Sequence, residues 1–210
     1  MKQTYLRIMS IVLYAILFLT NYNISGQQIT ATVPTGANPY AVALNPITNK
    51  IYAANIMGNN VTVIDGETNQ TSTIGTGGNP VAIAINTVTN KIYTANSGSK
   101  SVTVIDGATN STSTVAVGSQ PRSIAVNTVT NKIYVSNNNS LYITVIDGVT
   151  NTTKKIDIGN IPKAVVVNPL TNKIYVLTSY LLAEIDGSTD SPTDLVVVNG
   201  LKILHWRLTR

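Results

Sequence analysis

One five-residue segment, Thr-Asn-Lys-Ile-Tyr, occurs four times in this chain and constrains its fold more than any other feature. The copies begin at Thr48, Thr89, Thr130 and Thr171, so each begins 41 residues after the one before. A fixed period of this length is typical of one supersecondary unit repeated along the chain. Residues 27–200 are therefore expected to form an array of such units.

Other landmarks keep the same period. Four prolines recur at this step: Pro39, Pro80, Pro121 and Pro162. The aspartate of a Val-Ile-Asp-Gly segment does so at Asp65, Asp106 and Asp147, and a displaced fourth version of the segment ends at Gly187. Short apolar or alternating runs lie between clusters of Gly, Asn, Asp and Ser, a pattern of antiparallel strands joined by tight turns. No repeat has the apolar period of a helix. Each repeat is predicted to be a four-stranded antiparallel sheet.

The first predicted strand of each repeat alternates small and large apolar residues. In the first repeat the small residues are Ala41 and Ala43, and the large ones are Val42 and Leu44. Because side chains alternate across a strand, one face of the strand is small and the other is large. Such a strand suits the place where neighbouring sheets converge, as in the inner strand of a β-propeller blade. The prediction is an all-β, β-propeller-type array with blades near residues 40–75, 81–117, 122–158 and 163–199.

The segments that begin at the repeated tyrosine carry a resemblance to a known family. They read Tyr-Ala-Ala-Asn from Tyr52, Tyr-Thr-Ala-Asn from Tyr93, Tyr-Val-Ser-Asn from Tyr134 and Tyr-Val-Leu-Thr from Tyr175. With the upstream Asn-Pro and the downstream Val-Ile-Asp-Gly, residues 29–200 resemble the YVTN family of β-propeller repeats. The resemblance implies a ring of about seven blades, within the usual range for propellers. It implies little about function, since propellers carry unrelated activities on similar blades.

Four blades instead of a full ring predict an open or incomplete propeller. The two end blades would then each expose an apolar face, and such faces mark interaction sites. Another copy could cover them by self-association, or the chain could be a truncated gene product. Residues 29–33 are expected to add an extra outer strand, and residues 201–210 lose the repeat pattern and are assigned to an aberrant C-terminal tail.

The first residues have the layout of a secretory signal peptide. Lys2 and Arg7 precede an apolar run over residues 8–19, which is followed by a small and polar stretch. This layout predicts a signal peptide over residues 1–26. The alternative is an uncleaved membrane anchor, although the run is shorter than the roughly 20 residues that span a bilayer. A membrane partner is expected only in that case, and either interpretation predicts a secreted or cell-surface protein.

The distribution of charge argues against a nucleic-acid partner. The formal net charge is +5, with 14 basic and 9 acidic residues, but five of the basic residues lie near the termini. The remaining nine balance the nine acidic residues, which all lie between residues 27 and 194. A neutral repeat body lacks the positive surface that polyanions require. The chain contains no cysteine, which excludes disulfides and thiolate zinc sites.

No catalytic, cofactor-binding or metal-binding residue is predicted. His205 is the single histidine, and it lies in the aberrant tail without a partner histidine or cysteine for haem, copper or zinc. The repeated Asp-Gly is interpreted as a turn in which Asp bonds nearby backbone and Gly adopts a positive φ. A calcium site is the alternative, but closely spaced acidic ligands are missing. The repeated tyrosines are expected to pack between blades.

Two sets of polar residues are candidate sites. Lys100, Arg122 and Lys163 are expected in loops on one face of the array, where they form either a ligand rim or ordinary solvated charges. Asn-x-Ser/Thr sequons mark candidate N-glycosylation sites. They are Asn60, Asn69, Asn110, Asn138 and Asn151. Chance occurrence in an Asn- and Thr-rich sequence is the alternative explanation for the sequons.

Three functions are compatible with these features. The first is an exported, non-enzymatic binding or scaffold module, without a cofactor, for a protein or cell-envelope component. The second is a fragment of a catalytic propeller of the oxidoreductase type, which the lack of histidine and cysteine ligands disfavours. The third is a nucleic-acid-binding propeller, which the neutral repeat body disfavours.

Overall fold

A computed structural model describes residues 31–196, with side chains up to Pro192, and the chain divides into two units, Met1–Thr32 and Val33–Arg210. All strands of residues 31–196 lie in the second unit. The predicted signal peptide (1–26) and C-terminal tail (201–210), including His205, lie outside the described residues. Between residues 31 and 196 there is no helix of the length and hydropathy that crossing a membrane requires.

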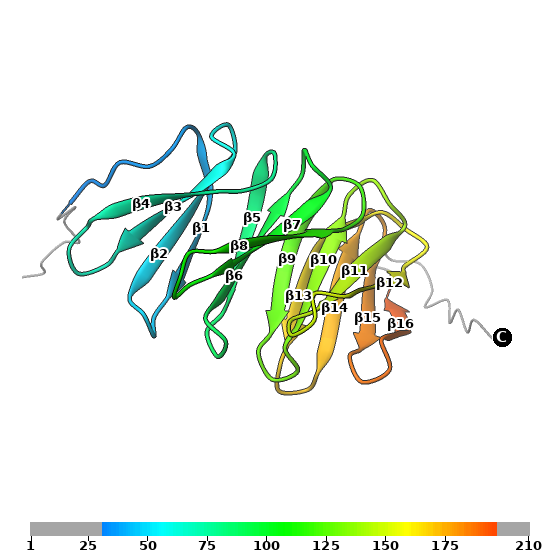
Figure 1. The fold of residues 1–210 in the computed structure, drawn as a ribbon. Helices are drawn as coiled ribbons and strands as arrows, with labels where there is room; N and C mark the ends of the chain where they lie inside the picture. Colours follow the sequence, from blue (N-terminus) through cyan, green and yellow to red (C-terminus); the bar gives the residue numbers. More distant parts are fainter. Residues whose placement is uncertain (1–30, 197–210) are drawn as a thin grey trace, which may run out of the picture. The chain divides into compact units, whose positions relative to one another are not determined.

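The strands form four antiparallel sheets, each of four strands paired in chain order (Figure 1). Blade 1 contains β1 (Pro39–Asn45), β2 (Lys50–Asn55), β3 (Asn60–Asp65) and β4 (Thr71–Gly75). Blade 2 contains β5 (Pro80–Asn86), β6 (Lys91–Asn96), β7 (Ser101–Asp106) and β8 (Thr112–Ala116). Blade 3 contains β9 (Pro121–Asn127), β10 (Lys132–Asn137), β11 (Tyr142–Asp147) and β12 (Thr153–Asp157). Blade 4 contains β13 (Pro162–Asn168), β14 (Lys173–Thr178), β15 (Leu182–Asp186) and β16 (Ser191–Val196). Each blade is one sequence repeat, which confirms the predicted array of four-stranded sheets.

The repeated Thr-Asn-Lys-Ile-Tyr segment encodes the turn between the first two strands of each blade. Its asparagine adopts the left-handed conformation, with φ of 52° at Asn49 and Asn90 and 53° at Asn131 and Asn172. Asparagine tolerates this region better than most residues. The lysine then begins the second strand, and the isoleucine and tyrosine that follow point to opposite faces of the sheet. The segment recurs because every blade needs the same turn and the same two faces.

Apolar cores lie between neighbouring blades. Tyr52 lies in the core of blades 1 and 2, Tyr93 in that of blades 2 and 3, and Tyr134 in that of blades 3 and 4. All three are 0% exposed. These positions confirm the predicted packing role of the repeated tyrosine. The fourth, Tyr175, is only half-buried, because no described blade follows blade 4.

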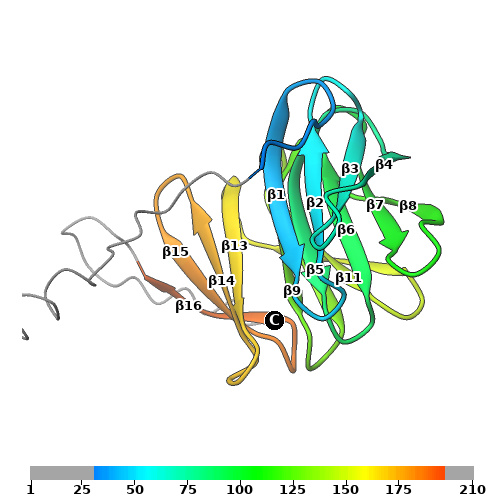
Figure 2. The same ribbon diagram turned by 90° about the vertical axis from the view of Figure 1, so that its left-hand side faces the viewer.

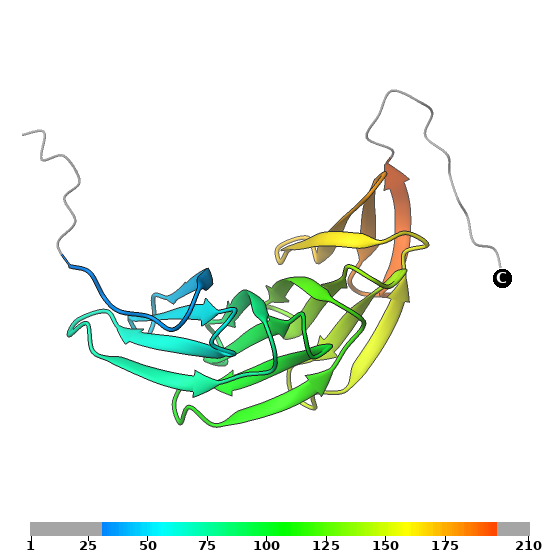
Figure 3. The same cartoon turned by 90° about the horizontal axis from the view of Figure 1, so that it is seen from above.

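The inner strands β1, β5, β9 and β13 lie next to one another (Figure 3). Two polar contacts recur where neighbouring blades meet. Asn45 Nδ2 donates to Asn90 Oδ1 of the next blade at 2.9 Å, and Lys50 Nζ donates to the carbonyl of Gly107 at 3.4 Å. The equivalent pairs are Asn86 to Asn131, Asn127 to Asn172, Lys91 to Gly148 and Lys132 to Gly187. These contacts hold each blade in the same register against the next.

The described part of the propeller is open. Three cores join its four blades, and none joins blade 4 to blade 1. Figure 2 views blade 1 with β1 and β2 in front. Val42 and Leu44 of β1 are 69% and 55% exposed, although they occupy positions that are packed in the later blades. The open or incomplete array predicted from four repeats is what these residues form.

The predicted extra outer strand at residues 29–33 is not supported where it can be described. Residues 31–33 form no strand. Blade 4 already has four strands of its own, from β13 to β16, so it has no missing outer strand for an N-terminal segment to supply.

Candidate functional site

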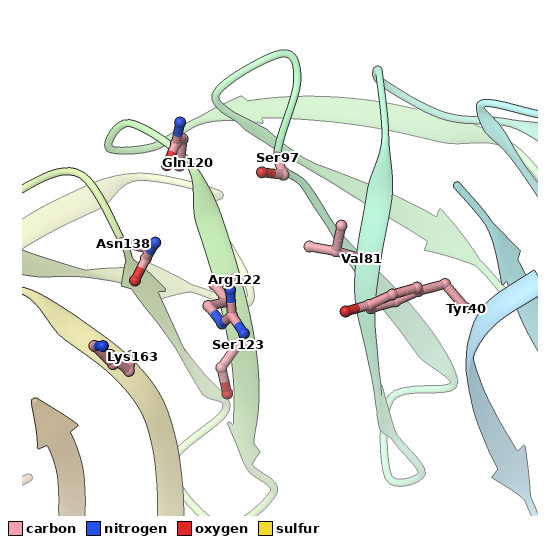
Figure 4. A pocket seen from close by; sticks show the side chains of 8 residues that line it. All are labelled: Tyr40, Val81, Ser97, Gln120, Arg122, Ser123, Asn138 and Lys163. Carbon is pink, nitrogen blue, oxygen red and sulfur yellow. The ribbon is translucent and has the colours of Figure 1, made fainter. Parts of the chain in front are cut away.

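A hollow of about 370 Å³ lies at the edge of the array where the inner strands begin, and this edge is called the entry edge here. Figure 4 shows the residues that line it. They are Tyr40, Val81, Arg122 and Lys163, together with Ser97, Gln120, Ser123 and Asn138. The first four occupy the same position in the four repeats, directly after the repeated proline. The hollow is therefore built by the repeat itself.

A β-bulge explains why this position faces the hollow. In β9, Pro121 pairs with Asn137 and Ser123 with Ser136, so Arg122 between them has no partner across the strands. The same shift leaves Tyr40, Val81 and Lys163 unpaired in β1, β5 and β13. A bulge inserts one extra residue and re-aims its side chain, which is why bulges are frequent beside functional sites.

Two serines connect blade 3 to β13, the strand that carries Lys163: Ser123 lies beside Arg122 in β9, and Ser136 lies in β10. Ser123 Oγ accepts a hydrogen bond from the Val165 amide at 3.2 Å, and Ser136 Oγ donates to the Lys163 carbonyl at 3.4 Å. Alanines occupy the equivalent positions in blades 1 and 2, so those blades cannot make these contacts: Ala41, Ala54, Ala82 and Ala95. The junction of blades 3 and 4 thus holds the two basic residues on strands that are tied together.

The lining of the hollow has one sign of charge. Arg122 and Lys163 are exposed, and no carboxylate is among the lining residues. An arginine fork and a lysine ammonium together suit a carboxylate or phosphate group. The exposed ring of Tyr40 and the amides of Gln120 and Asn138 supply the other contacts that a ligand could make.

The three residues of the predicted rim do not all come together. Arg122 and Lys163 line the hollow, but they lie in strands rather than in loops, because the bulge places them inside β9 and β13. Lys100 lies in the β6–β7 turn with φ 52°, and its carbonyl accepts the Val117 amide of the segment after β8. It shares the entry edge but is not part of the lining. Tyr40 was missed, although its place after the repeated proline could have indicated it.

The repeated Asp-Gly lies at the opposite edge and acts as a turn. Asp106 Oδ1 accepts the amides of Ala108 and Thr109, each at 2.9 Å. These hydrogen bonds, first that from Thr109, hold the pKa of Asp106 below its ordinary value. Within residues 31–196, no group of three or more His, Cys, Asp or Glu is placed to hold a metal ion. The turn interpretation is confirmed.

One detail of that interpretation is wrong. Gly107 does not have a positive φ, and the left-handed residue of this turn is Asn110, at φ 62°. The glycine is needed for close approach instead, because a Cβ at this position would lie 2.7 Å from the backbone oxygen of Asn90 and 2.5 Å from its Oδ1. A residue with a side chain would push the neighbouring turn away.

The turn aspartates predict an acid-sensitive fold. The pKa values of Asp65, Asp106, Asp147 and Asp186 are all lowered, mainly by hydrogen bonds from the residues that follow each one. The unfolded chain therefore binds more protons as the pH falls below about 4, so stability present at neutral pH is lost there. We expect the melting temperature to fall steadily from about pH 4 downward. Asp106→Asn should reduce this slope, and an unchanged slope would contradict the assignment.

The sequons differ in accessibility. Asn69 and Asn110 are exposed in turns before the outer strands, and Asn151 in the third such turn is half-buried. Asn60 is less suited to carry a glycan, because its Nδ2 donates to the Gly58 carbonyl and its Oδ1 accepts from Asn55. Asn138 is half-buried and lines the hollow. Only the two exposed sites combine a sequon with free access.

Comparison with known proteins identifies the fold. No protein-family model matches the chain, and no curated protein matches its sequence. Hydrazine synthase of Kuenenia stuttgartiensis matches with a TM-score of 0.71 and 21% identity, over 83% of this chain and 52% of that one. The chain has the β-propeller fold.

Two other solved structures agree. A nidogen–laminin complex matches with a TM-score of 0.61 and 14% identity, over 79% of this chain and 66% of that one. An auxiliary nutrient-binding protein from Bacteroides thetaiotaomicron matches with a TM-score of 0.60 and 16% identity, over 78% of this chain and 42% of that one. At these identities the likeness concerns the fold alone. This β-propeller spans between 42% and 66% of the chains it resembles.

Proposed function

We propose that this protein is an exported, non-enzymatic β-propeller of the YVTN type that binds an anionic group of a protein or cell-envelope component in the hollow at its entry edge. The observation that carries the proposal is the pairing of Arg122 and Lys163 on adjacent inner strands, both aimed by bulges into a hollow without a carboxylate. Charge-assisted hydrogen bonds to such a pair are stronger than those between neutral groups.

The size and shape of the hollow favour part of a larger ligand. Its volume of about 370 Å³ lies near the lower end of the range for small-molecule pockets. A carboxylate or phosphate at the end of a side chain or polymer would fit there, while the rest of the ligand lies across the entry edge. Of the matched structures, one is a complex of nidogen with laminin, and another is named a nutrient-binding protein.

The non-enzymatic role rests on the placement of the acidic groups. The turn aspartates lie at the edge opposite the hollow, because each ends the third strand of its blade. One carboxylate oxygen of each accepts turn hydrogen bonds, as at Asp65, where Oδ1 accepts the Thr68 amide at 2.8 Å. No carboxylate or histidine therefore faces Arg122 and Lys163 from the described lining.

A matched pair of double variants tests the binding site. We expect Arg122→Ala/Lys163→Ala to weaken binding of a short polyglutamate peptide and of inorganic phosphate about tenfold or more, since a hydrogen bond to a charged group contributes roughly 1.5–3 kcal/mol. Lys100→Ala/Lys155→Ala removes the same charge from residues outside the hollow and should leave binding unchanged. Isothermal titration calorimetry provides the measurement. Equal losses of affinity in both double variants would show that only the overall charge matters, and would contradict a binding site at the hollow.

A further inference from the structure

The two end blades expose surfaces that complement each other. In each blade, the leading face is the one turned toward the preceding blade, and the trailing face is turned toward the next. At the three described junctions, a trailing face packs against a leading face. The leading face of blade 1 and the trailing face of blade 4 have no such neighbour among the described residues.

The leading face of blade 1 is chemically the same surface that the other blades bury. Ile51 and Ile64 are half-buried there, whereas their equivalents in blade 2, Ile92 and Ile105, are 0% exposed. Val42 and Leu44 complete the same surface on β1, where their equivalents Ile83 and Ile85 pack against blade 1. The face is built to be covered, and what covers it elsewhere in the chain is always a trailing face.

The polar contacts of the junctions are also split between the two ends. In blades 2 to 4, an asparagine Oδ1 and a glycine carbonyl accept hydrogen bonds from the preceding blade. Asn49 and Gly66 are the equivalent acceptors in blade 1, and no described blade precedes them. Asn168 and Lys173 are the equivalent donors in blade 4. Each end therefore holds the half of the contact that the other end lacks.

The trailing face of blade 4 differs from the others in size and charge. Val166 and Leu177 stand where the earlier blades have alanine or serine, and they are 60% and 47% exposed. Bulk near the inner strands lowers the angle between neighbouring blades, so more blades are needed to complete the ring. Glu184 replaces the valine of earlier blades and forms an ion pair with Lys173. If another blade covered this face, the charge of Glu184 would therefore already be paired.

From these faces we propose that a second copy of this chain docks head to tail, with the trailing face of blade 4 of each copy on the leading face of blade 1 of the other. Two copies close a ring of eight blades, within the range of about four to eight that propellers adopt. Three copies would exceed that range. The second copy also places its Tyr40 beside Lys163 and so completes the wall of the hollow around the axis.

Light scattering coupled to size-exclusion chromatography tests the proposal on the purified protein at several concentrations. We expect a single species with twice the mass of the chain. Val42→Glu and Leu177→Glu each place a charge in the junction and should each halve the mass, while circular dichroism retains the β-sheet spectrum because both side chains are already exposed in one copy. Val88→Glu, at a turn residue that is 75% exposed and outside both faces, is the matched control and should stay dimeric.

Other results identify other occupants and overturn the proposal. A wild-type monomer at every concentration, with β1 amides protected from hydrogen exchange, would assign the cover to a segment outside the described residues. A dimer that Val42→Glu separates but Leu177→Glu does not would indicate pairing of two leading faces. Polymers that grow with concentration would show that the junction does not close a ring.

Discussion

Replacing Tyr93 by alanine is expected to lower the free energy of unfolding by about 3 kcal/mol, as truncation of a large buried side chain usually does. Tyr93 is 0% exposed and fills the core between blades 2 and 3 beside Val102, Val104 and Ile133. Truncation leaves a cavity between two sheets that cannot approach each other, because their inner strands and their polar junction contacts are already in place. Urea denaturation followed by circular dichroism measures the loss.

Two variants separate packing from other effects at this position. Tyr175→Ala makes the same change in the half-buried tyrosine of blade 4. Measured in the Val42→Glu background, where no second copy covers blade 4, it should cost clearly less. Tyr93→Phe removes only the hydroxyl, which is buried and makes no hydrogen bond within the described part of the chain. It should be neutral or stabilising, because no partner is left unsatisfied. A large loss in Tyr93→Phe would show that the hydroxyl, and not the ring, is important.

The architecture could be predicted because the four repeats can be compared with one another. Four copies of one pattern reveal which positions are always small, such as Ala41 and Ala82, and which always carry a tyrosine. These constraints come from packing against a neighbour of the same kind, so they are visible without any homologue. The extra strand at residues 29–33 was predicted by analogy with closed rings, and this reasoning fails where blade 4 supplies its own fourth strand.

The site was only partly predictable for a different reason. Arg122 and Lys163 were predicted as charges in loops on one face of the array, whereas they lie in strands. The β-bulge that aims them depends on how Pro121 and Ser123 pair with the next strand, which strand content alone does not specify. Lys100 was grouped with them because its turn lies at the same edge. Residues at one edge come together only if they also lie at the same distance from the inner strands, and Lys100 lies farther out, between the second and third strands.

The largest effect of a single methyl group is expected at the glycine of the Asp-Gly turn. In Gly107→Ala, the new Cβ would lie 2.7 Å from the backbone oxygen of Asn90, which also accepts the Gly107 amide. Backbone cannot rotate away as a side chain can, so the hydrogen bond from Gly107 to Asn90 must lengthen. Asn90 Oδ1 also accepts Asn45 Nδ2 of blade 1, so the strain reaches the junction between blades.

We expect Gly107→Ala to lower the free energy of unfolding by about 2 kcal/mol, within the range for overpacking. Gly75→Ala provides the matched control, because a Cβ there would have no atom within 4 Å and its φ is not positive. That variant should be neutral or slightly stabilising, since alanine restricts the unfolded chain. If the two variants melt at the same temperature, close approach does not explain the glycine. Residues before and after it would then have to account for the repeated Asp-Gly.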